Sequence, residues 1–144
     1  IVDAHEDFML VISYNPGYQT VLKDLKPSTK QRFVGIQFEY PSEAVEREIV
    51  AREAGGLDSD RVERLVAAGR RARALKDHGL EEATSTRALV YAGELMQAGL
   101  PPRTACRAAM IAPITDDPEL MQALEEIIAA HFPEAQEASA SAHG

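Results

Sequence analysis

A chain of 144 residues that is 45% hydrophobic can bury one modest core, or two small pieces that need a partner, but is too short for a complete nucleotide-driven motor. Its formal charge of -8 gives no long-range attraction to nucleic acid or to an anionic membrane. No apolar run reaches the roughly 18 residues of a membrane span, and no signal peptide is present, so we expect a soluble, cytoplasmic protein without membrane insertion. Because the chain begins with Ile1, we expect a fragment or a processed product.

Residues 1–41 predict two strands joined by a short helix. Residues 8–12 form a continuous apolar run of β-favouring residues, which predicts a strand that is buried on both faces and ends at a turn around Asn15 and Pro16. The apolar residues 34, 36, 38 and 40 alternate with glycine or polar residues, which predicts a second strand with one covered face. Pro41 ends this strand, and a short helix is expected within residues 27–32.

The rest of the chain predicts a helical bundle. About five helices follow, each with apolar residues at helical spacing and a start that favours a helix N-terminus. The expected starts are Ser42, Asp58 or Ser59, residues 84–86, residues 101–102, and Asp117. We therefore expect a helical domain at residues 42–133. Residues 134–144 carry no packing stripe and are expected to form a disordered tail.

The first predicted helix of the bundle has an apolar stripe and an acidic start. Val45, Ile49 and Val50 are expected to face the core. Glu43 and Glu46 are expected near the positive N-terminal end of the helix, where a carboxylate is favoured. No internal repeat is found, so the bundle reads as one domain.

Three polar residues stand out by their position. Asn15 follows the first predicted strand, Arg32 precedes the second, and Arg87 lies in the first turn of a predicted helix. Asn15 before Pro-Gly can be an ordinary turn residue, and Arg32 can be an ordinary surface charge. Arg87 is unusual because a cation is unfavourable beside the positive end of a helix unless an anion binds there, although Glu81 or Glu82 can compensate it as well.

Long strings within residues 4–132 resemble the CbbQ/NirQ/NorQ branch of the MoxR-type AAA+ ATPases. The strings are F-M-L-V-I-S-Y-N-P-G-Y-Q at residues 8–19, K-D-L-K-P-S-T-K-Q-R-F at 23–33, H-G-L at 78–80, S-T-R-A-L-V-Y-A-G at 85–93 and T-D-D-P at 115–118. Strings of this length are far more specific than an isolated short motif. The resemblance implies an incomplete α/β fold of the P-loop AAA+ type, with a remnant of the α/β core at residues 1–41 and a helical lid at residues 42–133.

The same resemblance implies a role for each of the three polar residues in ATP hydrolysis. Asn15 matches sensor 1, which helps to orient the attacking water beside the γ-phosphate. Arg32 matches the arginine finger, which acts in trans on the site of a neighbouring subunit, and Arg87 matches sensor 2, which contacts the ATP phosphates from the lid. The implied cofactors are ATP and Mg²⁺. The implied partners are a homo-oligomer, with a hexamer expected, a von Willebrand A-domain adaptor, and Rubisco or nitric oxide reductase as the client.

The sequence departs from the family in two motifs. No glycine is followed by lysine, so the Walker A loop G-x-x-x-x-G-K-S/T is absent, and no apolar strand ends in Asp-Glu to hold Mg²⁺ as Walker B does. We therefore expect this chain alone neither to bind ATP well nor to hydrolyse it. The family's strand order also places a missing strand between the two predicted here. Those two are expected to stay poorly paired, to pair with each other, or to pair with another chain.

Three other readings stay open from the residues alone. The chain can be a non-catalytic helical interaction module in which the three polar residues are structural. A DNA-binding helical domain can invoke the basic residues between positions 61 and 76, but the net charge argues against it. His5, His78 and His131 are scattered without metal spacing and are expected at the surface, while Cys106 is expected to be a buried helix residue.

Overall fold

The computed structural model describes residues 3–13, 26–75 and 83–133. The chain divides into two compact units, Ile1–Phe38 and Glu39–Gly144, and each is described by itself. In the first unit, the described residues contain one short helix, α1 (Pro27–Lys30), which begins with proline at its first turn. This is the helix expected within residues 27–32.

The two predicted strands are not formed, and the α/β prediction is wrong for the part of the chain that the structure describes. Residues 8–12 and 34–40 have no strand structure there. Most of their apolar side chains are exposed, with exposed fractions of 68% for Phe8, 91% for Val34 and 89% for Phe38. A strand needs a neighbour for its backbone N–H and C=O groups. An alternating pattern shows which side chains a sheet would cover, but it does not supply that neighbour.

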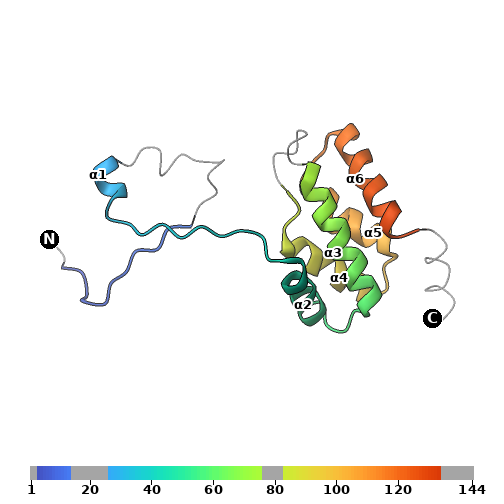
Figure 1. The fold of residues 1–144 in the computed structure, drawn as a ribbon, viewed down its shortest axis with the longest axis horizontal. Coiled ribbons are helices and arrows are strands. Elements are labelled where there is room, and N and C mark those ends of the chain that lie inside the picture. The colour runs from blue at the N-terminus through green and yellow to red at the C-terminus, as the bar shows by residue number, and fades with distance from the viewer. Residues whose placement is uncertain (1–2, 14–25, 76–82, 134–144) are drawn as a thin grey trace. The chain divides into compact units, whose positions relative to one another are not determined.

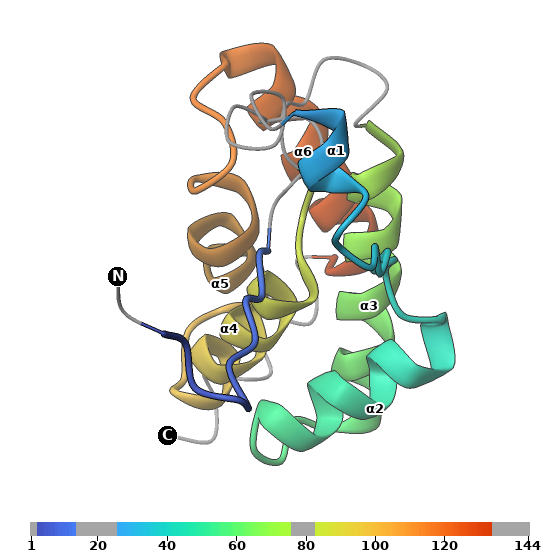
Figure 2. The same ribbon diagram turned by 90° about the vertical axis from the view of Figure 1, so that its left-hand side faces the viewer.

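The second unit is a bundle of helices (Figure 1). It is built from α2 (Glu43–Glu53), α3 (Ser59–Arg73), α4 (Thr86–Gln97), α5 (Pro102–Cys106), a π-helical turn η2 (Arg107–Ile111) and α6 (Pro118–His131). α3 packs against α2, α4 and α6, and α4 also packs against α2, α5 and η2 (Figure 2). No helix in residues 26–75 or 83–133 is long and apolar enough to cross a membrane.

The helix starts are where the sequence predicts them, and local side chains explain why. The Ser42 hydroxyl accepts a hydrogen bond from the Val45 N–H at 3.4 Å, and the Asp58 carboxylate accepts one from the Arg61 N–H at 3.0 Å. Such caps satisfy N–H groups that the first helical turn leaves without a partner. Ser85 caps α4 and Asp117 caps α6 in the same way. α5 has no side-chain cap and begins instead with Pro102, which has no N–H group to satisfy.

One continuous hydrophobic core lies inside the bundle. Phe132, which follows α6, is only 2% exposed and closes the core at the end of the described chain. The last carbonyl groups of α6 are bound from two other helices. Arg64 of α3 donates to the His131 carbonyl at 3.1 Å, and Arg103 of α5 donates to the Phe132 carbonyl at 2.7 Å. The core contains Val50, Leu57, Val62, Leu65, Val66, Leu89, Met96, Cys106, Met110, Ile111, Leu124, Ile128 and Phe132.

Gly93 allows α4 to approach the end of α2 closely. A Cβ atom at this position would lie 2.7 Å from the Ala54 Cβ and 3.3 Å from Leu57 Cδ2. We expect Gly93→Ala to lower the free energy of unfolding by about 1–2 kcal/mol, because overpacking outweighs the better helix propensity of alanine. Urea unfolding followed by circular dichroism measures this change.

The swap Ala54→Gly with Gly93→Ala is the matched control for this contact. It moves the methyl group across the same interface, and Ala54 has a φ of -74° that glycine accepts easily. We expect the swap to recover part of the lost stability. A Gly93→Ala variant that is as stable as the original protein contradicts the close approach.

Cys106 is fully buried, and burial raises the pKa of its thiol to about 12. The folded pKa of the thiol lies above its unfolded value of about 8.5. The buried neutral thiol therefore lowers stability at no pH below about 8.5, but the free energy of unfolding falls as the pH rises from there toward 12, because the unfolded thiol ionises first. Between pH 8 and pH 10 the unfolding free energy is expected to fall by about 2 kcal/mol more in the original protein than in Cys106→Ala. Urea titrations at both pH values test this, and equal losses in the two proteins contradict it.

Candidate functional site

The structure places two of the three predicted site residues, and each lies in its own unit. Asn15 lies outside the described residues. Arg32 is an exposed residue of the first unit, two positions after the end of α1, and its N–H donates to the Thr29 carbonyl at 3.1 Å. Arg87 is the second residue of α4 and is exposed, as expected from its position in the first helical turn.

Arg87 lies at the positive end of α4, and Glu81 and Glu82, which could compensate its charge, lie outside the described residues. Within residues 26–75 and 83–133, no carboxylate forms an ion pair with its guanidinium, and the first turn of α4 has no acidic residue. Ser85 caps the helix by accepting from the Ala88 N–H at 3.2 Å. A free cation beside exposed helix N–H groups favours the approach of an anion.

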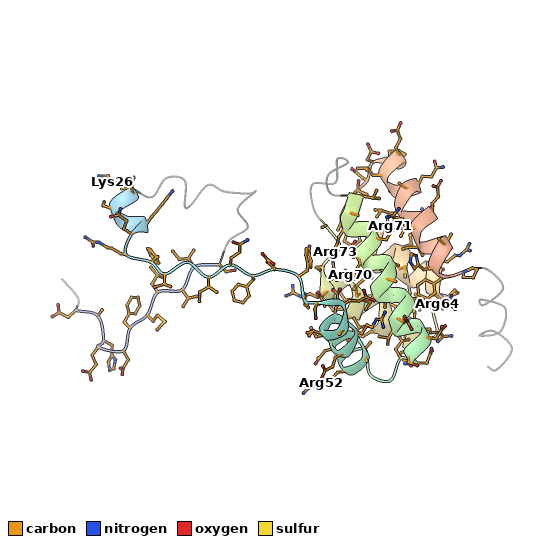
Figure 3. The ribbon with its side chains drawn as sticks, in the orientation of Figure 1. Lys26, Arg52, Arg64, Arg70, Arg71 and Arg73 are labelled. Carbon is orange, nitrogen blue, oxygen red and sulfur yellow. The ribbon has the colours of Figure 1, made fainter. Side chains whose placement is uncertain are left out.

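Beside this turn lies a buried ion pair that joins α2 to α3. Glu46 of α2 is 0% exposed and the Arg73 side chain, from the last turn of α3, is 10% exposed. The two Arg73 Nη atoms donate to both Glu46 carboxylate oxygens, at 2.9 and 2.6 Å. This paired geometry is the strong form of an arginine–carboxylate contact. Arg73 lies close to Arg70 and Arg71 at the same end of α3 (Figure 3).

The Glu46 carboxylate keeps its charge although it is buried. Burial raises the pKa of Glu46. Hydrogen bonds from Arg73 and Thr86, together with the charges of Arg73 and Arg70, lower it by more than burial raises it. The net pKa lies below the usual value for glutamate. The group is therefore a carboxylate at neutral pH, paired with a guanidinium that is always charged.

The same ion pair binds the start of α4 on two sides of its cap residue. The Thr86 hydroxyl donates to Glu46 Oε1 at 2.7 Å, and Arg73 Nε donates to the Thr84 carbonyl at 2.7 Å. The Tyr40 ring covers the Arg73 guanidinium, with 4.0 Å between the ring centroid and the guanidinium carbon. We call Tyr40, Glu46, Arg73, Thr84 and Thr86 the buried polar cluster.

Exposed ion pairs surround the buried polar cluster on α2 and α3. Arg47 pairs with Glu43 and, at 3.1 Å, with Glu63, and Arg70 lies 3.7 Å from Glu43. Such exposed pairs each contribute little to stability, between zero and about 1 kcal/mol. They differ in this respect from the Glu46–Arg73 pair, where loss of one partner leaves the other charge buried.

Glu46 and Arg73 were missed by the sequence analysis. Glu46 was expected near the positive N-terminal end of its helix and Val45 on the apolar stripe, but Val45 is 48% exposed and Glu46 is buried. A spacing signal was present. Glu46, Val50 and Ala54 recur every four residues, and Arg73 continues the apolar stripe of α3 at helical spacing from Val66 and Gly69. An acidic residue on the buried stripe of one helix and a basic residue on that of another indicate a buried ion pair.

The chemistry offered by the described residues is anion recognition by arginine. No group of three His, Cys, Asp or Glu residues in the described ranges can hold a metal ion, so no Mg²⁺ ligand set is found there. His131 binds the Ile127 carbonyl at 2.8 Å in its own helix, and Cys106 is buried. The exposed guanidinium of Arg87, beside a capped helix start, fits phosphate oxygens through its fork of donors.

Comparison with known proteins identifies relatives that match most of this chain. The family model described as CbbQ/NirQ/NorQ C-terminal matches residues 46–131, which run from α2 to the end of α6. The chain is 56% identical over 124 residues to the protein CbbQ of Hydrogenophilus thermoluteolus. These aligned residues make up 86% of this chain and 46% of that protein. It is 52% identical over 131 residues to the protein NorQ of Paracoccus denitrificans, with 91% and 48% covered.

A third relative is the denitrification regulatory protein NirQ of Stutzerimonas stutzeri. The identity is 46% over 129 residues, which cover 90% of this chain and 46% of that protein. The chain therefore spans about half the length of the curated relatives it matches. The residues that the family model matches include Arg87 and four members of the buried polar cluster, Glu46, Arg73, Thr84 and Thr86.

Proposed function

Because this chain belongs to the CbbQ/NirQ/NorQ C-terminal family, we propose that it is the C-terminal part of an AAA+ remodelling ATPase, in which the helical unit forms the lid over the nucleotide. The observation that carries the proposal is Arg87. It is an exposed cation in the first turn of α4, with no ion-pair partner among the described residues. A phosphate is the ligand that this arrangement favours.

In the proposed enzyme, Arg87 is the sensor 2 residue that contacts the ATP phosphates. Arg32 is the arginine finger that reaches the site of a neighbouring subunit, and Asn15 is the sensor 1 residue. ATP and Mg²⁺ are the cofactors in this proposal, and the Walker A and Walker B motifs that hold them belong to a part of the whole protein other than these 144 residues. The arginines of this chain would place positive charge beside the phosphates, and the metal, when bound, would neutralise negative charge on them.

The partners follow from the same proposal. The whole protein assembles into a ring, because an arginine acting in trans needs a neighbouring subunit, and the resemblance to the family implies a hexamer. A von Willebrand A-domain adaptor connects it to the client. The client in this proposal is Rubisco or nitric oxide reductase, and one relative is named a denitrification regulatory protein, which agrees with a role in denitrification. Genomic neighbours decide between the two clients.

ATP hydrolysis tests the proposal directly. The activity is measured for this chain alone and for the whole protein, meaning this chain joined to the upstream residues of its own gene. We expect only the whole protein to hydrolyse ATP. If the whole protein is inactive, or the upstream gene encodes no G-K-S/T loop, the ATPase proposal fails and a non-catalytic helical interaction module takes its place.

A further inference from the structure

The start of α4 is held by a buried charge pair in addition to the apolar packing of Leu89. Thr84 and Thr86 lie on either side of the cap residue Ser85, and each is bonded to a different member of the Glu46–Arg73 pair, at 2.7 Å in both cases. Ser85 itself is engaged with the Ala88 N–H. Three successive residues are therefore fixed immediately before Arg87.

The orientation of the Arg73 guanidinium is also fully determined. Its Nε atom donates to Thr84, and its two Nη atoms donate to Glu46. One face of the guanidinium is covered by the Tyr40 ring at 4.0 Å. The side chain therefore has little rotational freedom, and it transmits a fixed position from α2 and α3 to the start of α4.

Stability alone is a weak reason to bury such a pair. Well-packed apolar residues of similar volume often stabilise a protein as well as a buried ion pair does, because desolvation of two charges is costly. A directional network gives what apolar packing does not, which is a defined position for the groups that it binds. The group next to this network is Arg87, whose fork of donors is useful only in one orientation.

We propose that Glu46 and Arg73, acting through Thr86, are positioning residues that set Arg87 for contact with the nucleotide phosphates. This inference rests on the proposed function, because it takes Arg87 to be the phosphate-binding residue. None of the three positioning residues touches the nucleotide itself. Their effect on turnover passes entirely through Arg87.

The test is a double-mutant cycle in the whole protein between Thr86→Val and Arg87→Ala. Thr86→Val removes the hydroxyl but keeps the side-chain shape. It is therefore milder than Glu46→Gln, which leaves the buried Arg73 charge without its counter-ion. We expect Thr86→Val to lower kcat/KM for ATP by on the order of tenfold, below the hundredfold that a 1 Å misplacement can cost. Thr86→Ser keeps the hydroxyl and is expected to restore turnover.

The decisive comparison is made in the Arg87→Ala background. If Thr86 acts through Arg87, adding Thr86→Val to Arg87→Ala causes no further loss. Glu43→Gln is the matched control, because it removes one exposed ion pair within α2 and one between α2 and α3, and it is expected to leave turnover unchanged. Melting temperatures of all variants are measured alongside.

Each outcome has a separate meaning. The positioning role is overturned if the losses of kcat/KM in Thr86→Val and Arg87→Ala add in full in the double variant. It is also overturned if Thr86→Val alone has normal turnover. Both outcomes leave the proposed ATPase intact. An Arg87→Ala variant with normal KM and kcat removes Arg87 from the nucleotide site, and the positioning role falls with it. A non-additive cycle with rescue by Thr86→Ser supports the inference.

Discussion

The variant Arg32→Ala is expected to lower the ATP turnover of the whole protein by at least about a thousandfold, while nucleotide binding stays nearly unchanged. Arginine fingers contribute about 10³–10⁵ to turnover, because the guanidinium stabilises charge that develops on the transferring phosphoryl group. Arg32 is exposed, and its guanidinium forms no ion pair within the described residues, so its loss breaks no side-chain contact there. Steady-state hydrolysis and binding of a fluorescent nucleotide measure the two effects.

The control for Arg32 is Lys30→Ala, which removes an exposed cation from the last turn of α1, two positions before Arg32. It is expected to leave turnover within about twofold, because a solvated surface charge contributes little. Arg32→Lys keeps the charge but not the planar fork, and it is expected to remain strongly impaired.

Mixing experiments test whether Arg32 acts between subunits. Arg32→Ala subunits are combined with subunits whose phosphate-binding loop in the upstream part is inactivated. Mixed rings contain some sites with an intact loop and an intact neighbouring Arg32, so activity above that of either variant alone is expected. No recovery in rings that demonstrably mix contradicts the action in trans.

The second large effect is expected in Glu46→Gln, which should lower the free energy of unfolding by about 3 kcal/mol. Breaking a buried ion pair leaves the Arg73 charge without its counter-ion, which costs about 3–5 kcal/mol, and the glutamine amide keeps part of the hydrogen bonding. Domains are stable by only about 5–15 kcal/mol, so this loss is a large share of the total. Urea unfolding at pH 7 measures it, with Glu43→Gln as the exposed control on the same helix.

The pH dependence gives a second signature of the pair. The folded pKa of Glu46 lies below its unfolded value of about 4.3, so the stabilisation is present above about pH 4.3 and is lost as the pH falls through the folded pKa. The difference in unfolding free energy between the original protein and Glu46→Gln is therefore expected to be constant above about pH 5 and to narrow below about pH 4.

Replacing both partners distinguishes an unpaired charge from lost packing. A variant with Glu46→Leu and Arg73→Leu is expected to be more stable than either single replacement, because no buried charge is left alone. A double variant as unstable as the sum of the two singles points instead to packing as the main contribution of these side chains.

The helical part of the fold was predictable from the sequence because its signals are local. Ser42, Asp58 and Asp117 bind N–H groups two or three residues ahead, so each marks a helix start without reference to the rest of the chain. Arg87 was placed in a first helical turn by the same reasoning, since Ser85 precedes it. The family was recognisable from long strings of residues, and the comparisons confirm it.

Contacts between distant segments decided the rest. The alternating residues 34–40 are extended without forming a strand in the described chain, because a strand depends on a neighbour that its own sequence does not provide. Glu46 and Arg73 lie 27 positions apart and meet only when α2 packs on α3. A charged residue can face solvent or a buried partner at the same helical spacing, and only the packed helices determine which environment it has.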